Sequence, residues 1–302
     1  MNGHARTNGM IGAAGLGGTR PTIWRTARLW PLMAVLAVVV AGCTAPASSA
    51  EQPGATGSAG SSAASNARGA APAPDSSASP IAGASSVGVL VEEDGDHFCT
   101  ASVVASPKGN VVATAAHCLQ EAGGDARDED DVLEFAPGFT GEGQGTFPYG
   151  RWKVRAVQLD DRWKDDADDA DTADYAFLTL EPDAEGRQAQ QVVGGAAADW
   201  SSSPERRVTV VAYPNAEHNP GNRPIACTTE THEDPELPRM LRMECGGFWS
   251  GTSGAPWLAD YQDAEHQGRL IAVLSGGDTD SESTAALFDE RAHELYERAA
   301  RA

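Results

Sequence analysis

Short apolar runs, each ending at a turn, dominate the chain after Ile81 and restrict the folds that it can adopt. Valines occupy the alternate positions Val87, Val89 and Val91, and the apolar run that follows is divided at Pro107–Asn110. Further short runs occupy residues 152–157, 175–180, 208–213, 240–245 and 270–275. Strands of this length with turns between them are typical of an all-β sandwich or barrel. About 220 residues suffice for two small barrels.

The end of the chain has a different period. Apolar residues recur there at helical spacing, at Phe288, Ala292, Leu295, Tyr296 and Ala299. This spacing predicts an amphipathic α-helix at the C-terminus.

Residues 1–42 are typical of an export signal. Arginines up to Arg28 precede the apolar run Leu29–Gly42, which is short for a membrane span. The run ends in Val-Ala-Gly-Cys, which resembles the bacterial lipobox, and that resemblance implies that Cys43 receives a diacylglycerol. Two acyl chains would anchor the protein stably to the outer face of a bacterial membrane. The alternatives are an ordinary cleaved signal, with release to the medium, or an uncleaved anchor.

Residues 43–81 form the next predicted region. Between Thr44 and Pro80 the chain consists almost entirely of Ala, Ser, Gly and Pro. Such a segment buries too little apolar surface to offset its chain entropy, so we expect a disordered tether. The folded domain is predicted to span residues 82–302.

The charge excludes one class of partner. The net charge of −21 argues against nucleic acid, whose phosphates require clustered Lys and Arg. Self-repulsion of this size favours a soluble protein, which we expect to be a monomer. No cofactor motif is present.

Five cysteines are present, and Cys43 is assigned to the lipid. The remaining four, Cys99, Cys118, Cys227 and Cys245, are an even number, as two disulfides in an exported protein require. A zinc site would need closely spaced Cys or His pairs, and the sequence has none, so we predict no metal site.

Three segments carry candidate catalytic groups. Ser253 lies in the glycine-rich stretch GGFWSGTSGAPWL, His117 in TAAHCL and Asp174 in DTADYAFLTL. A serine hydroxyl becomes nucleophilic when a neutral histidine accepts its proton and an acid orients that histidine. A disulfide between Cys118 and Cys99 would fix the backbone at the histidine. Asp171 is the nearest competitor of Asp174, which alone directly precedes an apolar strand.

The segments TAAHC, DYAFL and GTSGAP, in the order His, Asp, Ser, resemble the chymotrypsin-like (trypsin-fold) serine endopeptidases, particularly their bacterial secreted branch. The resemblance covers the chain from about Ser86 to its end. It implies two six-stranded antiparallel barrels with the site between them, and a C-terminal helix. It also implies a peptide or protein substrate, with His117 as general base and acid, Asp174 as the orienting acid and Ser253 as the nucleophile.

The same resemblance assigns further positions. The backbone N–H groups of Gly251 and Ser253 would form the oxyanion hole. Gly247 stands where members that cleave after Arg or Lys carry Asp at the pocket floor, so such specificity is not expected. The substrate-binding strand would include Ser275, Gly276 and Gly277. The residue before it is Leu274, where glutamate-cleaving relatives often carry His, and we expect a preference for apolar or small side chains.

Three expectations remain. Cys227 and Cys245 enclose 17 residues, and we predict that they pair as the staple of a hairpin or loop. The acidic run Asp160–Asp171 contains no turn glycine, so we interpret it as solvated surface rather than a calcium loop. The competing function is that of a catalytically silent member of the fold, retained as a binding module on the cell surface.

Overall fold

The computed structural model describes residues 76–92, 95–125, 132–277 and 279–302. The predicted signal 1–42, the lipidation site Cys43 and the tether as far as residue 75 lie outside the described residues. Within the described part of the chain, no helix combines the length and the apolar character that crossing a membrane requires.

The first barrel is a closed antiparallel sheet with the strand order β2-β3-β4-β7-β6-β5. Its strands are rich in valine, and all five residues of β2 and of β7 are buried, because these strands contact the core on both faces. In the described chain its strands are β2 (Val87–Val91), β3 (His97–Val104), β4 (Val111–Thr114), β5 (Glu134–Pro137), β6 (Trp152–Leu159) and β7 (Ala176–Leu180).

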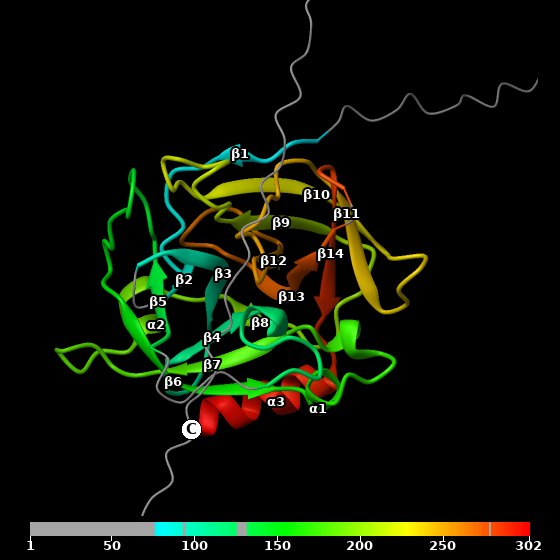
Figure 1. Ribbon diagram of the computed structural model, residues 1–302, viewed down its shortest axis with the longest axis horizontal. Helices are drawn as coiled ribbons and strands as arrows, with labels where there is room; N and C mark the ends of the chain where they lie inside the picture. Colours follow the sequence, from blue (N-terminus) through cyan, green and yellow to red (C-terminus); the bar gives the residue numbers. More distant parts are fainter. Residues whose placement is uncertain (1–75, 93–94, 126–131, 278) are drawn as a thin grey trace, which may run out of the picture. The chain divides into compact units, whose positions relative to one another are not determined.

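The second barrel follows the order β10-β11-β14-β13-β12-β9, and the pairing of β9 with β10 closes it. Its described strands are β9 (Arg207–Ala212), β10 (Ile225–Glu233), β11 (Met240–Glu244), β12 (Pro256–Ala259), β13 (Arg269–Gly276) and β14 (Glu282–Leu287). The short strands β1 (Ser79–Pro80) and β8 (Ala197–Ala198) attach to β10 and β13. The prediction of two six-stranded antiparallel barrels is therefore confirmed (Figure 1).

The short helical segments of the described chain lie in loops that precede β9. They are the single-turn elements η1 (Ala116–Cys118), α1 (Asp161–Lys164), η2 (Ala170–Ala173) and α2 (Ala189–Val193).

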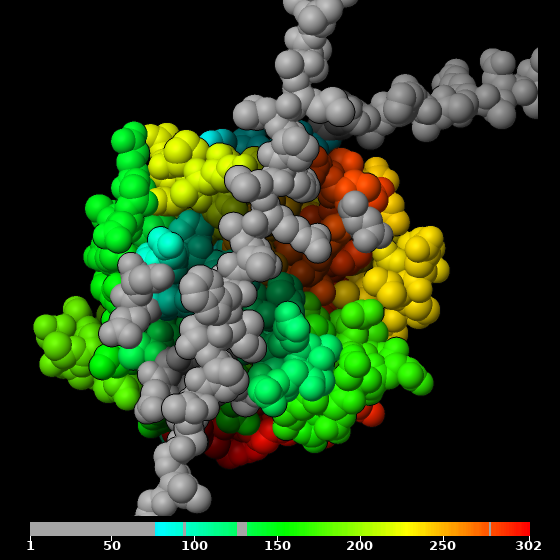
Figure 2. All heavy atoms as spheres, viewed as in Figure 1, coloured from blue at the N-terminus to red at the C-terminus, as the bar shows by residue number. Residues whose placement is uncertain are grey.

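The predicted C-terminal helix is present as α3 (Glu290–Arg301). Asp289 caps it by accepting hydrogen bonds from the N–H groups of Arg291 and Ala292. The apolar face of α3 packs on β6 and β7, and the Thr179 hydroxyl donates to Ala299 O at 3.0 Å. In Figure 2 the red surface of α3 borders the green surface of the first barrel.

The beginning of the folded domain differs from the prediction. Residues 76–81 were assigned to the disordered tether, yet Ser79 and Pro80 pair with β10. Ala78 N–H also donates to Gly246 O at 2.8 Å, and Gly246 N–H donates to Ser76 O at 2.9 Å. Small side chains suit a tether, but they equally permit this close backbone pairing. The fold thus includes residues from Ser76 onward rather than from Ala82.

Both predicted disulfides are present. Cys99 on β3 is joined to Cys118 at the end of η1. Cys227 on β10 is joined to Cys245, which directly follows β11. The second bond therefore spans a β-hairpin, in agreement with the expected staple.

The acidic run Asp160–Asp171 is not solvated surface throughout, and this part of the prediction is wrong. The Asp160 side chain is buried, where it caps α1 and binds Arg162 at 3.0 Å. Arg162 is also buried, and it donates to the hydroxyls of Thr172 and Tyr175. Burial opposes ionisation of Asp160, but the hydrogen bonds and charge of Arg162 outweigh it and lower the pKa of this carboxyl.

We predict that Arg162→Met destabilises the protein by about 3 kcal/mol, because it leaves the Asp160 carboxylate buried without its partner. Chemical denaturation at neutral pH measures this loss. The control is Arg187→Met, which removes an exposed ion pair with Asp183 and should leave the denaturation midpoint nearly unchanged. Equal midpoints for the two variants would contradict the assignment.

Candidate active site

Ser253 lies in the segment between β11 and β12, in a turn that requires two glycines. Gly251 has φ +96°, and a Cβ there would lie 2.8 Å from Asn215 N and 2.9 Å from Tyr213 O. Gly254 has φ +80°, and its Cβ would lie 2.2 Å from the Thr114 hydroxyl. Only glycine tolerates such contacts. The bare backbone at Gly254 lets the turn press against the end of β4 in the first barrel.

His117 lies three residues beyond that contact. It is the middle residue of η1, and the neighbouring Cys118 is tied to β3 by the disulfide. The two sulfur atoms and one imidazole nitrogen lie within 4.8 Å of one another. Since the disulfide consumes both thiolates, this group cannot act as a metal site.

Asp174 occupies the C-terminal cap of η2, directly before the Tyr175 and β7 segment, and is only 2% exposed. Its Oδ1 accepts from the backbone N–H of His117 at 2.9 Å, and its Oδ2 contacts His117 Nδ1 at 2.7 Å. The hydroxyl of Ser275 donates to Oδ2 at 2.5 Å. A carboxylate only accepts hydrogen bonds, so Nδ1 carries a proton, and in the neutral imidazole Nε2 keeps its lone pair. Asp171, the competing residue, makes no such contact.

The environment of His117 changes its basicity. Burial disfavours the charged imidazolium, but the hydrogen bond that His117 donates to Asp174 and the negative charge of Asp174 outweigh this effect and raise the pKa of His117 above its ordinary value. The side chain keeps about a third of its surface exposed. His117 is therefore a stronger base than a free imidazole and remains accessible to a ligand.

The segments that carry Ser253 and His117 lie next to each other. Thr100 N–H donates to Ser253 O at 2.8 Å, and a Cβ at Gly254 would lie 2.8 Å from Ala115 N. Among the described residues, however, Ser253 Oγ has no hydrogen-bond partner, so a bond to His117 is not formed in this state. Catalytic hydrogen bonds are often long without substrate and tighten when it binds.

The two amides predicted for an oxyanion hole point away from internal acceptors. Ser250 O accepts from Asn215 N–H at 2.7 Å, and Thr252 O accepts from Ala255 N–H at 3.0 Å. In a trans peptide the N–H points opposite to the C=O, so the amides of Gly251 and Ser253 face the other way. Neither amide has an acceptor among the residues that the structure describes. Two free donors in the turn that carries the Ser253 hydroxyl suit the binding of an anionic oxygen.

The predicted substrate-binding positions separate into two groups. The Ser275 side chain turns toward Asp174, at a register irregularity between Leu274 and Gly276 in the β13–β14 pairing. Its side chain is thus part of the Asp174 site, a contact that the sequence interpretation missed. Gly276 borders open space.

The other two glycines have different surroundings. A Cβ at Gly277 would lie 2.2 Å from Glu282 O, and one at Gly247 would lie 3.5 Å from the Ala78 side chain. Gly247 therefore borders the segment that begins at Ser76. The role of these glycines in substrate binding stays a prediction.

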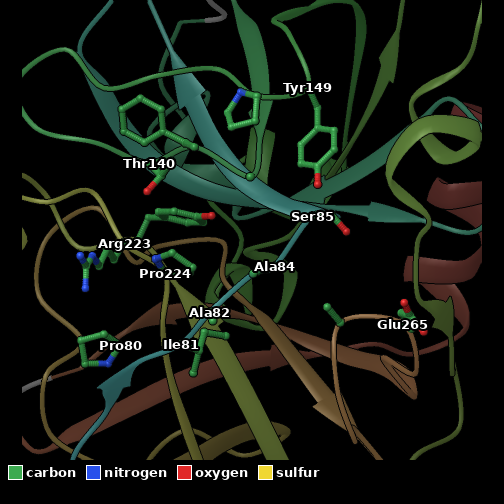
Figure 3. Close-up of a pocket in the computed structure, with 16 residues that line it drawn as sticks. Pro80, Ile81, Ala82, Ala84, Ser85, Thr140, Tyr149, Arg223, Pro224 and Glu265 are labelled. Atoms are coloured by element: carbon green, nitrogen blue, oxygen red, sulfur yellow. The ribbon is translucent and has the colours of Figure 1, made fainter.

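A cavity of about 680 Å³ lies away from these residues. The segment 80–85 lines it, together with Tyr149, Arg223 and Glu265. In Figure 3 the side chains of Arg223 and Glu265 lie on opposite sides of it, with Tyr149 above. Neither His117, Asp174 nor Ser253 lines this cavity.

The family follows from comparison with known proteins. Residues 75–289 match the family described as Trypsin. The chain belongs to this family. The predicted resemblance to trypsin-fold serine proteases is thereby confirmed.

Solved structures of the same fold include bacterial and human proteins. Protease Anisep from Arthrobacter nicotinovorans is 23% identical, with a TM-score of 0.63. The aligned region covers 74% of this chain and 97% of the Anisep chain. The thermostable serine protease AL20 from an extremophilic microorganism is 26% identical, with a TM-score of 0.62, and covers 72% of this chain and 98% of its own. Human heparin binding protein is 12% identical, with a TM-score of 0.54, and covers 74% of this chain and 95% of its own. No curated protein is significantly similar to the chain in sequence.

We predict that the imidazole of His117 titrates above 6.5 and that Asp174→Asn lowers its midpoint below 6.5. The substitution removes the charge that raises the pKa and leaves the burial that lowers it. Proton NMR of the imidazole resonances measures both midpoints, with His117→Gln to assign the signal. A midpoint that does not move in Asp174→Asn would show that the carboxylate does not control this base.

Proposed function

We propose that the protein is a serine endopeptidase in which Ser253 is the nucleophile, His117 the general base and acid, and Asp174 the orienting acid. The observation that supports this best is the Asp174–His117 pair. A buried carboxylate holds Nδ1 of an accessible, strengthened base. The family and its protease neighbours support the same reaction class.

The first half of the reaction forms an acyl-enzyme. Ser253 Oγ attacks the carbonyl carbon of the peptide bond while Nε2 of His117 takes the hydroxyl proton. The amides of Gly251 and Ser253 bind the resulting oxyanion, and Asp174 stabilises the imidazolium. When the C–N bond breaks, His117 returns the proton to the leaving amine.

The second half uses water. His117 removes a proton from a water molecule, whose oxygen attacks the acyl carbon. The tetrahedral intermediate then collapses, the ester bond to Ser253 breaks, and Nε2 returns the proton to Ser253 Oγ. The products are a carboxylic acid and the free enzyme.

The substrate class follows from the pocket positions. Gly247 supplies no charge for an Arg or Lys side chain. Leu274 supplies none of the hydrogen bonds that a glutamate side chain would need. We therefore propose a preference for apolar or small side chains before the cleaved bond, in a peptide or protein substrate that a monomer binds without a cofactor.

A second candidate function has one observation in its favour. Ser253 Oγ lacks a hydrogen bond to His117 or any other described residue, as in a catalytically silent binding module. Reactivity of the hydroxyl distinguishes the two functions.

We predict stoichiometric labelling of the purified full chain by a fluorophosphonate, which reacts with an activated serine. Intact mass spectrometry measures one adduct per chain. Ser253→Ala should abolish labelling, whereas Ser250→Ala, in the same turn, should retain it. Absence of labelling in a folded, disulfide-intact chain would favour the binding module.

We also propose that the protein is tethered to the outer face of a bacterial membrane through a diacylglycerol on Cys43. The sequence around Leu29–Cys43 supports this, and so do the two disulfides, which form in oxidising compartments.

In bacterial cells fed an alkyne-bearing fatty acid, we predict that the protein is labelled and fractionates with membranes, since two acyl chains give stable anchoring. Cys43→Ala should lose the label and leave the membrane fraction, while Thr44→Ala should keep both. Membrane retention of Cys43→Ala would point to an uncleaved anchor. Release of the parent protein would point to an ordinary signal.

A further inference from the structure

Thr100 connects the first barrel to the turn that carries Ser253. It lies on β3 next to Cys99 and is fully buried. Its backbone N–H donates to Ser253 O, and its hydroxyl donates to Gly251 O at 2.9 Å. The same hydroxyl accepts from Tyr213 N–H at 3.0 Å. One side-chain oxygen thus bridges two backbone groups of the second half of the chain.

The hydroxyl contacts the central one of three successive peptides. The outer two, Ser250–Gly251 and Thr252–Ser253, present the free amides described above. The central Gly251–Thr252 peptide is hydrogen-bonded at both of its polar groups. Its carbonyl faces Thr100, and its N–H donates to Trp249 O at 3.1 Å. A displacement of this peptide would shift both flanking amides, because it moves the Cα atoms of Gly251 and Thr252, which the flanking peptides share.

We propose that the Thr100 hydroxyl is a positioning group for the oxyanion hole, acting through the Gly251 carbonyl. This inference rests on the proposed endopeptidase function. Thr100 does not touch the reacting atoms. Its effect is to hold the central peptide so that the amides of Gly251 and Ser253 stay directed at one point.

Removal of the hydroxyl has a defined consequence. Gly251 O and Tyr213 N–H would both lose a partner, in a region where Tyr213 and Thr252 are almost fully buried. Unpaired buried groups are unfavourable, and a displacement of the Gly251–Thr252 peptide toward other donors relieves one of them. The displacement shifts the two oxyanion-hole donors, so transition-state binding weakens while binding of the remaining substrate is retained.

The test compares Thr100→Val, which keeps the shape and removes the hydroxyl, with Thr100→Ser, which restores it. The matched control is Thr231→Val. Thr231 is also buried on a strand, its hydroxyl donates to Pro204 O, and it accepts from Arg206 N–H at 3.3 Å. Thr231→Val therefore leaves the same two kinds of backbone group unpaired, and none of its partners belongs to the site.

The measurement is the rate of acylation by p-nitrophenyl acetate per site titrated with a fluorophosphonate, which counts only folded molecules. Loss of one oxyanion donor costs about 10²–10³ in rate, so displacement of two should cost at least about tenfold in Thr100→Val. Thr100→Ser and Thr231→Val should stay within about threefold of the parent. The pKa on the acid side of the pH–rate profile should be the same in the parent and in all three variants, because the His117–Asp174 pair is unchanged.

The outcomes separate this proposal from the proposed function. Equal rates for the parent and Thr100→Val, or an equal loss in Thr231→Val or Thr100→Ser, would overturn the positioning role while the labelled parent stands as an enzyme. An unlabelled parent would overturn both proposals. Should Thr100→Val not fold, Thr100→Ala, in which water can occupy the vacated space, should still lose more rate than Thr231→Ala. Equal losses in these two variants would overturn the role.

Discussion

The buried carboxylate of Asp174 accepts hydrogen bonds from both barrels, and the geometry of the candidate site depends on it. His117 reaches it from the loop after β4, and Ser275 reaches it from β13. A displacement of one barrel against the other would leave this carboxylate buried with fewer donors, which is costly. The alignment of the two barrels and the orientation of the imidazole are therefore set by the same group.

The local parts of this architecture were predictable from the sequence. The spacing of Leu295, Tyr296 and Ala299 identified α3, and apolar runs identified β6, β7, β9, β11 and β13 to within two residues at each end. The order of the three motifs predicted that His117, Asp174 and Ser253 lie in one region. These features depend on periodicity or on short segments, which a sequence displays directly.

The remaining parts depend on contacts between distant residues. Ser275 contacts Asp174 at an irregularity in the β13–β14 pairing, and no residue type in the sequence indicates such a shift in register. Asp160 lies within an acidic run, and only its pairing with Arg162 explains its burial. Residues 76–81 have the composition of a linker, yet Ser79 and Pro80 within them pair with β10 of the second barrel. In the sequence, Thr100 is only a polar residue within an apolar strand, and nothing there indicates its contacts with Gly251 and Tyr213.

The bond between Cys99 and Cys118 gives the chain a dependence on its surroundings. In a reducing compartment both thiols stay free, and the segment that carries His117 lacks its covalent link to β3. The base would then be held only by Asp174 and by ordinary packing. The candidate catalytic residues therefore acquire their full rigidity only where oxidation is possible.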